Sequence, residues 1–160
     1  MIKEFMEYFV ENSHSGARLR IYREIPISEP KAVVHISHGM AEHAGRYAWF
    51  MQILKEAGYA VYAHDIRGHG YTYAYNSSKG HFCNKNGLDK ILHDLDFSID
   101  LIKKNHPNIP IYCFGHSLGS ILLLRYATSS YHRINGIACW NSGVETNLLA
   151  IVGRIILSIE

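Results

Sequence analysis

Hydrophobic and polar residues recur along this chain with two different periods, and these periods divide it into segments. Near the N-terminus, two strand-like runs flank the turn-forming residues 12–16, so an antiparallel hairpin is expected. Farther along, short apolar runs typical of buried strands alternate with stretches whose apolar residues recur every three or four positions, as on one helix face. The predicted strands cover 4–10, 18–25, 32–36, 59–66, 111–114 and 134–140, and the predicted helices 47–57, 88–102 and 117–127.

This order of segments predicts an α/β fold. A hairpin followed by alternating strands and helices forms a mostly parallel sheet with helices on both faces. Ligands of such sheets bind at the carboxyl ends of the parallel strands, where residues 38–40, 65–70 and 117 fall. The loop over 67–86 is unusually long, which indicates a functional role. Four aspartates of the helix over 88–102 lie largely off its apolar stripe and are interpreted as a solvated flank: Asp89, Asp94, Asp96 and Asp100.

The segment Gly115-His116-Ser117-Leu118-Gly119 carries the strongest chemical signal, because it joins an apolar strand to a predicted helix. Strand, G-x-S-x-G and helix together are typical of a nucleophile elbow, a tight turn that lifts the serine hydroxyl above the sheet. Side chains at 115 and 119 would collide with neighbouring segments, so glycine is expected there. The helix would also direct backbone N–H groups at the site, which suits a developing oxyanion. The alternative is a simple turn without chemistry.

Composition excludes several other functions. The formal net charge of +2 over 160 residues is too small to indicate a nucleic-acid partner. The eleven histidines lack the spacing of metal-binding motifs, so we expect no metal and no other cofactor. The odd number of cysteines favours reduced thiols and a cytoplasmic protein. We expect neither a signal peptide nor a membrane span.

Three blocks of the sequence resemble the monoacylglycerol lipase and lysophospholipase group of α/β-hydrolases, which shares the domain called serine aminopeptidase S33. The blocks are residues 38–47 (HGMAEHAGRY), residues 64–70 with Thr72, and residues 115–119. The resemblance implies an α/β-hydrolase fold and a small-molecule acyl ester substrate, with Ser117 as the nucleophile. It also implies that the backbone N–H groups of Met40 and Leu118 form the oxyanion hole.

The same resemblance implies a supporting role for the residues around these groups: His38, Gly39, Gly115, His116 and Gly119. For His38 we favour a structural role, with a satisfied imidazole, over direct catalysis. Asp65 and His69 are likewise expected to hold their loop rather than to react. Met40-Ala41 departs from the small residues, such as Ala-Gly, that these lipases often carry, and this departure would alter the shape of the acyl pocket.

The general base is missing from the expected place. This fold puts an acid and then a histidine after the nucleophile, whereas only His132, Glu145 and Glu160 follow Ser117. His132 ends a helix that begins at the serine, roughly 20 Å away at 1.5 Å per residue. We therefore expect an incomplete α/β-hydrolase with the first six strands, with residues 1–143 as the core and 144–160 as the start of a cap. A helix predicted over 148–159 would form a lid, contact a membrane peripherally or simply pack.

Two classes of function remain open. The first is a serine esterase acting on monoacylglycerols or lysophospholipids, and the second is a non-catalytic remnant that binds a lipid or a partner. Serine at position 117 argues against haloalkane dehalogenases and epoxide hydrolases, which carry aspartate at that place. Thioesterases and peptidases of the same fold are weaker alternatives. The sequence does not indicate an oligomeric state.

Overall fold

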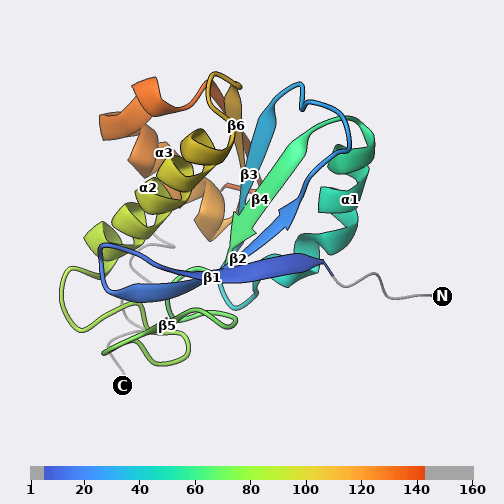
Figure 1. Ribbon diagram of the computed structural model, residues 1–160. Helices are drawn as coiled ribbons and strands as arrows, with labels where there is room; N and C mark the ends of the chain where they lie inside the picture. Colours follow the sequence, from blue (N-terminus) through green and yellow to red (C-terminus); the bar gives the residue numbers. More distant parts are fainter. Residues whose placement is uncertain (1–5, 143–160) are drawn as a thin grey trace.

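The computed structural model describes residues 6–142. They form a twisted sheet with helices on both of its faces (Figure 1). The strands are β1 (Glu7–Asn12), β2 (Ala17–Glu24), β3 (Val33–Ser37), β4 (Ala60–His64), β5 (Tyr73–Ala74), β6 (Ile111–His116) and β7 (Gly136–Trp140). The helices are α1 (Ala48–Glu56), α2 (Gly87–Asn105) and α3 (Leu118–Ser130), with 3₁₀ turns at Ala44–Tyr47 and Tyr131–Arg133. Each strand and helix predicted for these residues is present, with its ends shifted by a few positions.

The strands follow the order β1-β2-β4-β3-β6-β7, and β5 pairs with β2. Strands β4, β3, β6 and β7 run parallel, whereas β1, β2 and β5 pair antiparallel. The predicted hairpin and the six predicted strands are therefore confirmed. The short strand β5 was missed, because two residues inside a loop are too few to show an alternating pattern.

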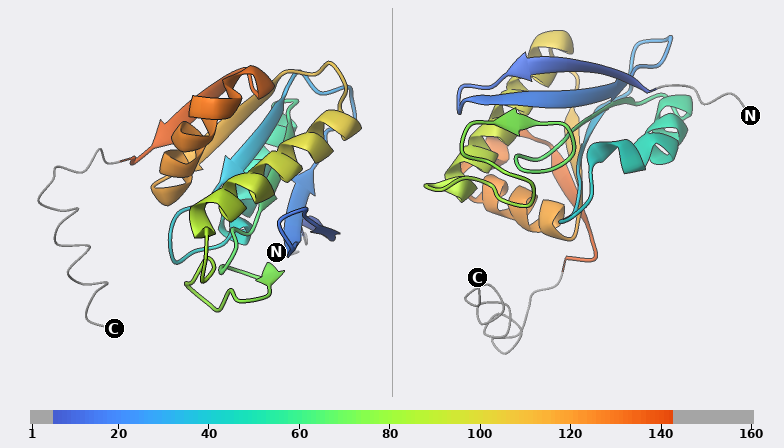
Figure 2. Two further views of the ribbon diagram at one scale, coloured as in Figure 1. Left: turned by 90° about the vertical axis from the view of Figure 1, so that its left-hand side faces the viewer. Right: turned by 90° about the horizontal axis from the view of Figure 1, so that it is seen from below.

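The two faces of the sheet carry separate cores, beneath helices that lie on opposite sides of it (Figure 2). Helices α2 and α3 cover one face, where Ile99, Ile111 and Leu123 are fully buried. Helix α1 covers the other face and buries Met51 against Ile36. Burying a side chain of this size contributes about 1.5–3 kcal/mol. Burial on both faces therefore determines which residues of each strand point to which side of the sheet. The predicted placement of helices on both faces is confirmed.

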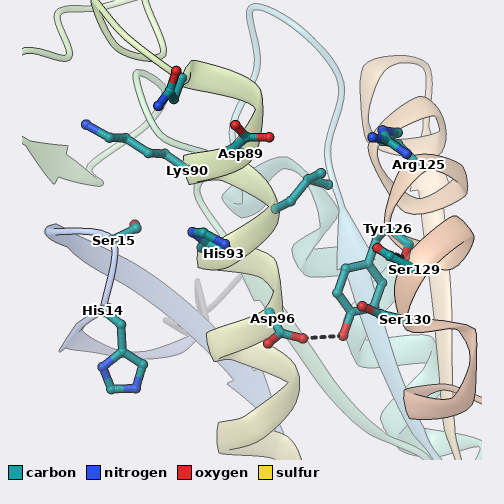
Figure 3. Close-up of a pocket in the computed structure, with 12 residues that line it drawn as sticks. His14, Ser15, Asp89, Lys90, His93, Asp96, Arg125, Tyr126, Ser129 and Ser130 are labelled. Atoms are coloured by element: carbon teal, nitrogen blue, oxygen red, sulfur yellow. Dashed lines mark hydrogen bonds between the residues drawn. The ribbon is translucent and has the colours of Figure 1, made fainter.

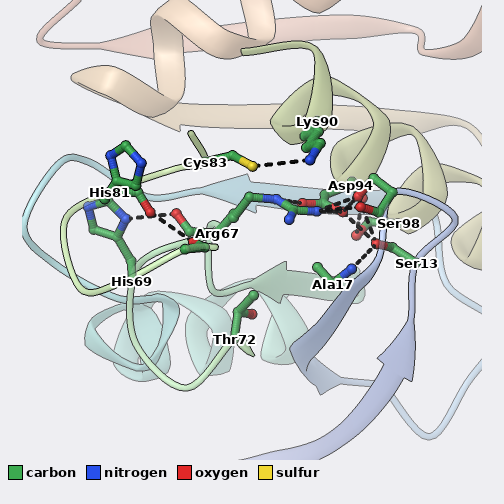
Figure 4. A network of polar contacts seen from close by, with 12 residues as sticks. Ser13, Ala17, Arg67, His69, Thr72, His81, Cys83, Lys90, Asp94 and Ser98 are labelled. Carbon is green, nitrogen blue, oxygen red and sulfur yellow. Dashed lines mark hydrogen bonds and ion pairs between the residues drawn. The ribbon is translucent and has the colours of Figure 1, made fainter. Parts of the chain in front are cut away.

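The interpretation of the α2 aspartates as a solvated flank is wrong for Asp94 (Figure 4). Its side chain is fully buried, and Oδ2 lies 2.9 Å from Arg67 Nε. Ser13 Oγ donates to Oδ1 at 2.6 Å, and Ser15 Oγ donates to the same oxygen. Position 94 falls within the buried stripe of α2, and a carboxylate is tolerated there because the guanidinium of Arg67 neutralises it. This network fastens α2 to the β1–β2 turn and to the start of the long loop.

The carboxyl ends of β3, β4 and β6 meet at one edge of the sheet, beside the loop over 65–86 (Figure 1). This edge therefore gathers the three segments that the sequence singled out: residues 38–40, residues 65–70 and Ser117. The predicted cap over 144–160 and its helix over 148–159 lie outside the described residues. The boundary between core and cap accordingly stays a prediction.

Candidate active site

Ser117 occupies the sharp turn that joins β6 to α3. Its backbone has φ 50° and ψ −115°, a combination that side-chain-bearing residues rarely adopt. Such a conformation costs of order 1–3 kcal/mol and persists only where the surrounding structure enforces it. Part of that enforcement comes from β7, since the Ser117 N–H donates to the Trp140 carbonyl at 2.9 Å. The turn predicted between strand and helix is present.

The two glycines of the motif are required by packing. A Cβ atom on Gly115 would lie 2.6 Å from the Cα atom of Ser120 in α3. A Cβ atom on Gly119 would lie 2.0 Å from the carbonyl oxygen of Ser37, at the end of β3. Contacts this short with backbone atoms could be relieved only by moving the backbone itself. They confirm that residues 115 and 119 must be glycine, and they place the segment after β3 directly against the first turn of α3.

Two backbone N–H groups near this turn have no hydrogen-bond partner in residues 6–142. Leu118 is the first residue of α3, where the N–H lacks an intrahelical acceptor. The Met40 N–H is also unused. The orientation of the Met40 N–H follows from the preceding carbonyl, because His38 Nδ1 donates to Gly39 O at 2.7 Å. In a planar trans peptide the N–H points opposite to the carbonyl, so the Met40 N–H is directed away from His38.

His38 is a buried imidazole with both nitrogens engaged. The Ile66 N–H donates to His38 Nε2 at 2.8 Å, so the proton resides on Nδ1, which donates to Gly39. Burial lowers the pKa of His38 to about 4. The ring therefore stays neutral near pH 7, which is the condition that the structural interpretation of His38 requires.

The buried carboxylate of Asp65 ties together three segments at the carboxyl edge. Its Oδ1 accepts from the Ala44 N–H at 2.8 Å, and its Oδ2 accepts from the Tyr71 N–H at 2.8 Å and from Tyr22 Oη at 3.2 Å. Burial, together with the Asp65 charge, raises the pKa of Tyr22 to about 12. His69 lies in the same loop, and its Nδ1 donates to Arg67 O at 3.2 Å. These contacts agree with a loop-holding role for both residues.

Glu42 is the residue of this site that sequence reasoning missed, although it lies within the block that carries the family resemblance. Its Oε1 accepts hydrogen bonds from the Gly39 N–H, from Tyr47 Oη at 2.8 Å and from His116 Nδ1 at 3.0 Å. Its Oε2 lies 3.3 Å from Arg46 Nη1. Burial by itself would raise the pKa of this carboxyl, but the hydrogen bonds from His116, Gly39 and Tyr47 outweigh it and hold the pKa below its usual value.

No general base contacts Ser117 within the part of the chain that the structure describes. The Ser117 side chain makes no hydrogen bond there, and it does not cap α3. His132 belongs to the 3₁₀ turn Tyr131–Arg133, which follows the far end of the 13-residue helix α3. It is therefore too distant to deprotonate the serine, as the sequence indicated.

Two hollows are lined by the segments that carry Met40 and His116. One of about 700 Å³ lies between the segment Met40–His43 and residues 68–71 and 79–80 of the long loop. The other, of about 650 Å³, is lined mainly by aromatic side chains and includes His116. A larger hollow of about 860 Å³ lies away from Ser117, between the β1–β2 turn, α2 and α3 (Figure 3). There Tyr126 Oη donates to Asp96 at 2.6 Å, across the space between α3 and α2.

Within residues 6–142, no three histidine, cysteine, aspartate or glutamate side chains are grouped closely enough to hold a metal ion. Among the helices of that same range, none combines the length and the apolar character needed to cross a bilayer.

The strand order, the helices on both faces and the strained serine between β6 and α3 define an α/β-hydrolase. Residues 28–158 match the family described as serine aminopeptidase, S33, and the chain belongs to this family. Monoglyceride lipase of Rattus norvegicus is 31% identical over 112 residues, covering 70% of this chain and 35% of the lipase. Monoacylglycerol lipase of Mycolicibacterium smegmatis is 34% identical over 119 residues, covering 72% and 40%.

A solved structure agrees with the sequence relatives. A thermostable carboxyl esterase from Bacillus coagulans superimposes with a TM-score of 0.77 and 27% identity, over 96% of this chain and 51% of the esterase. The chain spans little more than a third of the length of the two curated lipases, with 35% and 40% covered.

Proposed function

We propose that these residues form the nucleophile half of a serine ester hydrolase that acts on monoacylglycerols or lysophospholipids. The observation that carries the proposal is Ser117, held in a strained turn between strand and helix with its hydroxyl unused by the rest of residues 6–142. A strained backbone without a structural task for its side chain is typical of reactive positions. The similarity to monoglyceride lipases and to a carboxyl esterase supports an ester substrate.

In this proposal Ser117 Oγ attacks the ester carbonyl carbon. The carbonyl oxygen gains negative charge and accepts hydrogen bonds from the Met40 and Leu118 N–H groups, which have no other partner among the described residues. The serine proton passes to a base, and the alcohol leaves after protonation, so that an acyl-serine remains for hydrolysis. Donors of this kind stabilise the transition state by roughly 2.7–4 kcal/mol each.

The base is proposed to come from outside residues 1–160, because no histidine after Ser117 is near enough. By itself this chain would then acylate slowly, since loss of the base leaves roughly 10³–10⁴-fold acceleration over water in serine proteases. The lack of a nearby histidine after Ser117 also favours the second candidate, a protein that binds an acyl ester at this site without turning it over.

The test combines acylation and turnover. The 160-residue protein is incubated with p-nitrophenyl butyrate, and intact-mass and peptide mass spectrometry locate any acyl group. We expect a slow acyl adduct on Ser117, absent from Ser117→Ala, with turnover far below that of a complete lipase. Absence of any adduct would favour the non-catalytic candidate. Efficient, saturable turnover abolished by Ser117→Ala would show that a base within these residues, or from a second copy, completes the site.

A further inference from the structure

Gly39 is held at both of its backbone polar groups. Its N–H donates to Glu42 Oε1, and its carbonyl accepts from His38 Nδ1 at 2.7 Å. A Cβ atom at this position would lie 2.8 Å from Glu42 Oε1 and 3.0 Å from His116 Nδ1. The Gly39 backbone therefore lies directly against both side chains, and the orientation of the next peptide, which carries the Met40 N–H, is fixed from two sides.

Glu42 also connects this loop to the serine turn. The carboxylate oxygen that accepts from Gly39 also accepts from His116 Nδ1 at 3.0 Å, and His116 immediately precedes Ser117. A carboxylate has no proton to donate, so His116 must carry its proton on Nδ1 in this contact. The Glu42 side chain is 7% exposed, and water therefore competes weakly for these hydrogen bonds. Tyr47 supplies a third donor to the same oxygen, from the turn that precedes α1.

We propose that Glu42 is a positioning residue: by bridging Gly39 and His116, its carboxylate fixes the Met40 N–H relative to Ser117. This inference rests on the proposed function, in which the Met40 N–H receives the developing oxyanion. The bridge joins segments that are 74 positions apart, from Glu42 to His116. Glu42 holds the Gly39 N–H, while His38 holds the Gly39 carbonyl, which belongs to the same peptide as the Met40 N–H.

The kinetic test uses a fluorophosphonate probe, with labelling of Ser117 followed by intact-mass spectrometry. Glu42→Ala removes all the acceptor positions, and we expect the maximal labelling rate, kinact, to fall by about 10- to 100-fold. Misplacement of a catalytic group by about 1 Å costs that much. The half-saturating concentration, KI, should stay within about twofold, because the donor acts only in the transition state. Glu42→Gln keeps a carbonyl oxygen for Gly39, so its kinact should return to within about threefold of the wild type.

Two controls separate positioning from general stability. Glu29→Ala makes the same change of charge at an exposed loop residue, and its kinact should equal that of the wild type. Tyr47→Phe removes one donor to Glu42 but leaves the bridge between Gly39 and His116 intact. A kinact that follows the melting temperature across all variants, or that falls as far in Tyr47→Phe as in Glu42→Ala, would overturn the inference.

A second readout does not depend on activity. In ¹H–¹⁵N spectra of the wild-type protein, we expect a slowly exchanging Gly39 amide and a His116 ring protonated on Nδ1. Both features should be lost in Glu42→Ala and kept in Glu29→Ala. A Gly39 amide that exchanges equally fast with and without Glu42 would sink the proposal. If the fluorophosphonate does not label Ser117 in the wild-type protein, the proposed function is wrong. The exchange rate of the Gly39 amide then still shows whether Glu42 positions this loop.

Discussion

The substitution Asp94→Asn removes one charge from the ion pair that Asp94 forms with Arg67 inside the protein. The asparagine keeps the shape of the side chain, but the guanidinium of Arg67, only 1% exposed, loses its counter-charge. Breaking a buried pair by neutralising one partner costs about 3–5 kcal/mol. Since domains are stable by about 5–15 kcal/mol, this loss is a large share of the total. The melting temperature of a chain of this size should fall on the order of 10 °C.

The assay is urea unfolding followed by tryptophan fluorescence, with Asp89→Asn as the matched control. Asp89 lies in the first turn of the same helix but is exposed, so its neutralisation should cost only about 0.3–1 kcal/mol through the helix dipole. The double substitution Arg67→Met with Asp94→Leu should regain most of the stability, because both charges then leave the interior together. Equal midpoints for Asp94→Asn and Asp89→Asn, at equal m-values, would refute the reasoning.

Three further outcomes follow from the geometry. Because the folded-state pKa of His38 is about 4 against an ordinary 6.5, the unfolded chain binds more protons between these values, and stability is lost as pH falls through that window. In urea unfolding, His38 should account for about 2 kcal/mol of the stability lost between pH 7 and pH 5, so this loss should be smaller by about that amount in His38→Asn. Gly119→Ala should prevent stable folding, whereas Gly80→Ala, whose Cβ meets nothing within 4 Å, should cost about 1 kcal/mol in thermal unfolding. Ser117→Gly should raise the free energy of unfolding by about 1 kcal/mol, because glycine tolerates φ 50°, and it should abolish probe labelling. A lower free energy of unfolding in Ser117→Gly would contradict the inference that the Ser117 backbone is strained.

The sequence predicted the architecture well because each strand and helix has a clear period of its own. The stripe over 91–102 and the apolar run over 111–114 are local signals, and both elements formed where expected. The strand–turn–helix context of Ser117 is local too. Local periodicity could not reveal which charges meet across the fold: Asp94 was placed in solvent because its partner, Arg67, lies 27 residues away.

The same limit applies to the candidate site. The glycines at 115 and 119 were predicted from the shape of a tight turn, and packing confirms them. Glu42 was overlooked because nothing in its neighbourhood of sequence shows that His116 approaches from 74 positions away. The glutamate did stand inside the block that carries the family resemblance, so the motif marked it before its contacts were known. The roles of Ser117 and the two backbone donors stay predictions until acylation is measured.

The pairing of β3 with β6 has a consequence for the order in which the molecule is built. Val33 lies opposite Ile111, so the two strands that bracket the site are separated by a long stretch of chain. Closing so large a loop is slow compared with forming the hairpin or a helix. During synthesis, the segment 38–42 would emerge with strands β1 to β4 long before the serine turn exists. In a nascent chain stalled before residue 111, the hairpin should therefore be protected from proteolysis. The Gly39 peptide should still lack its connection to the serine turn, because His116 has not yet been made.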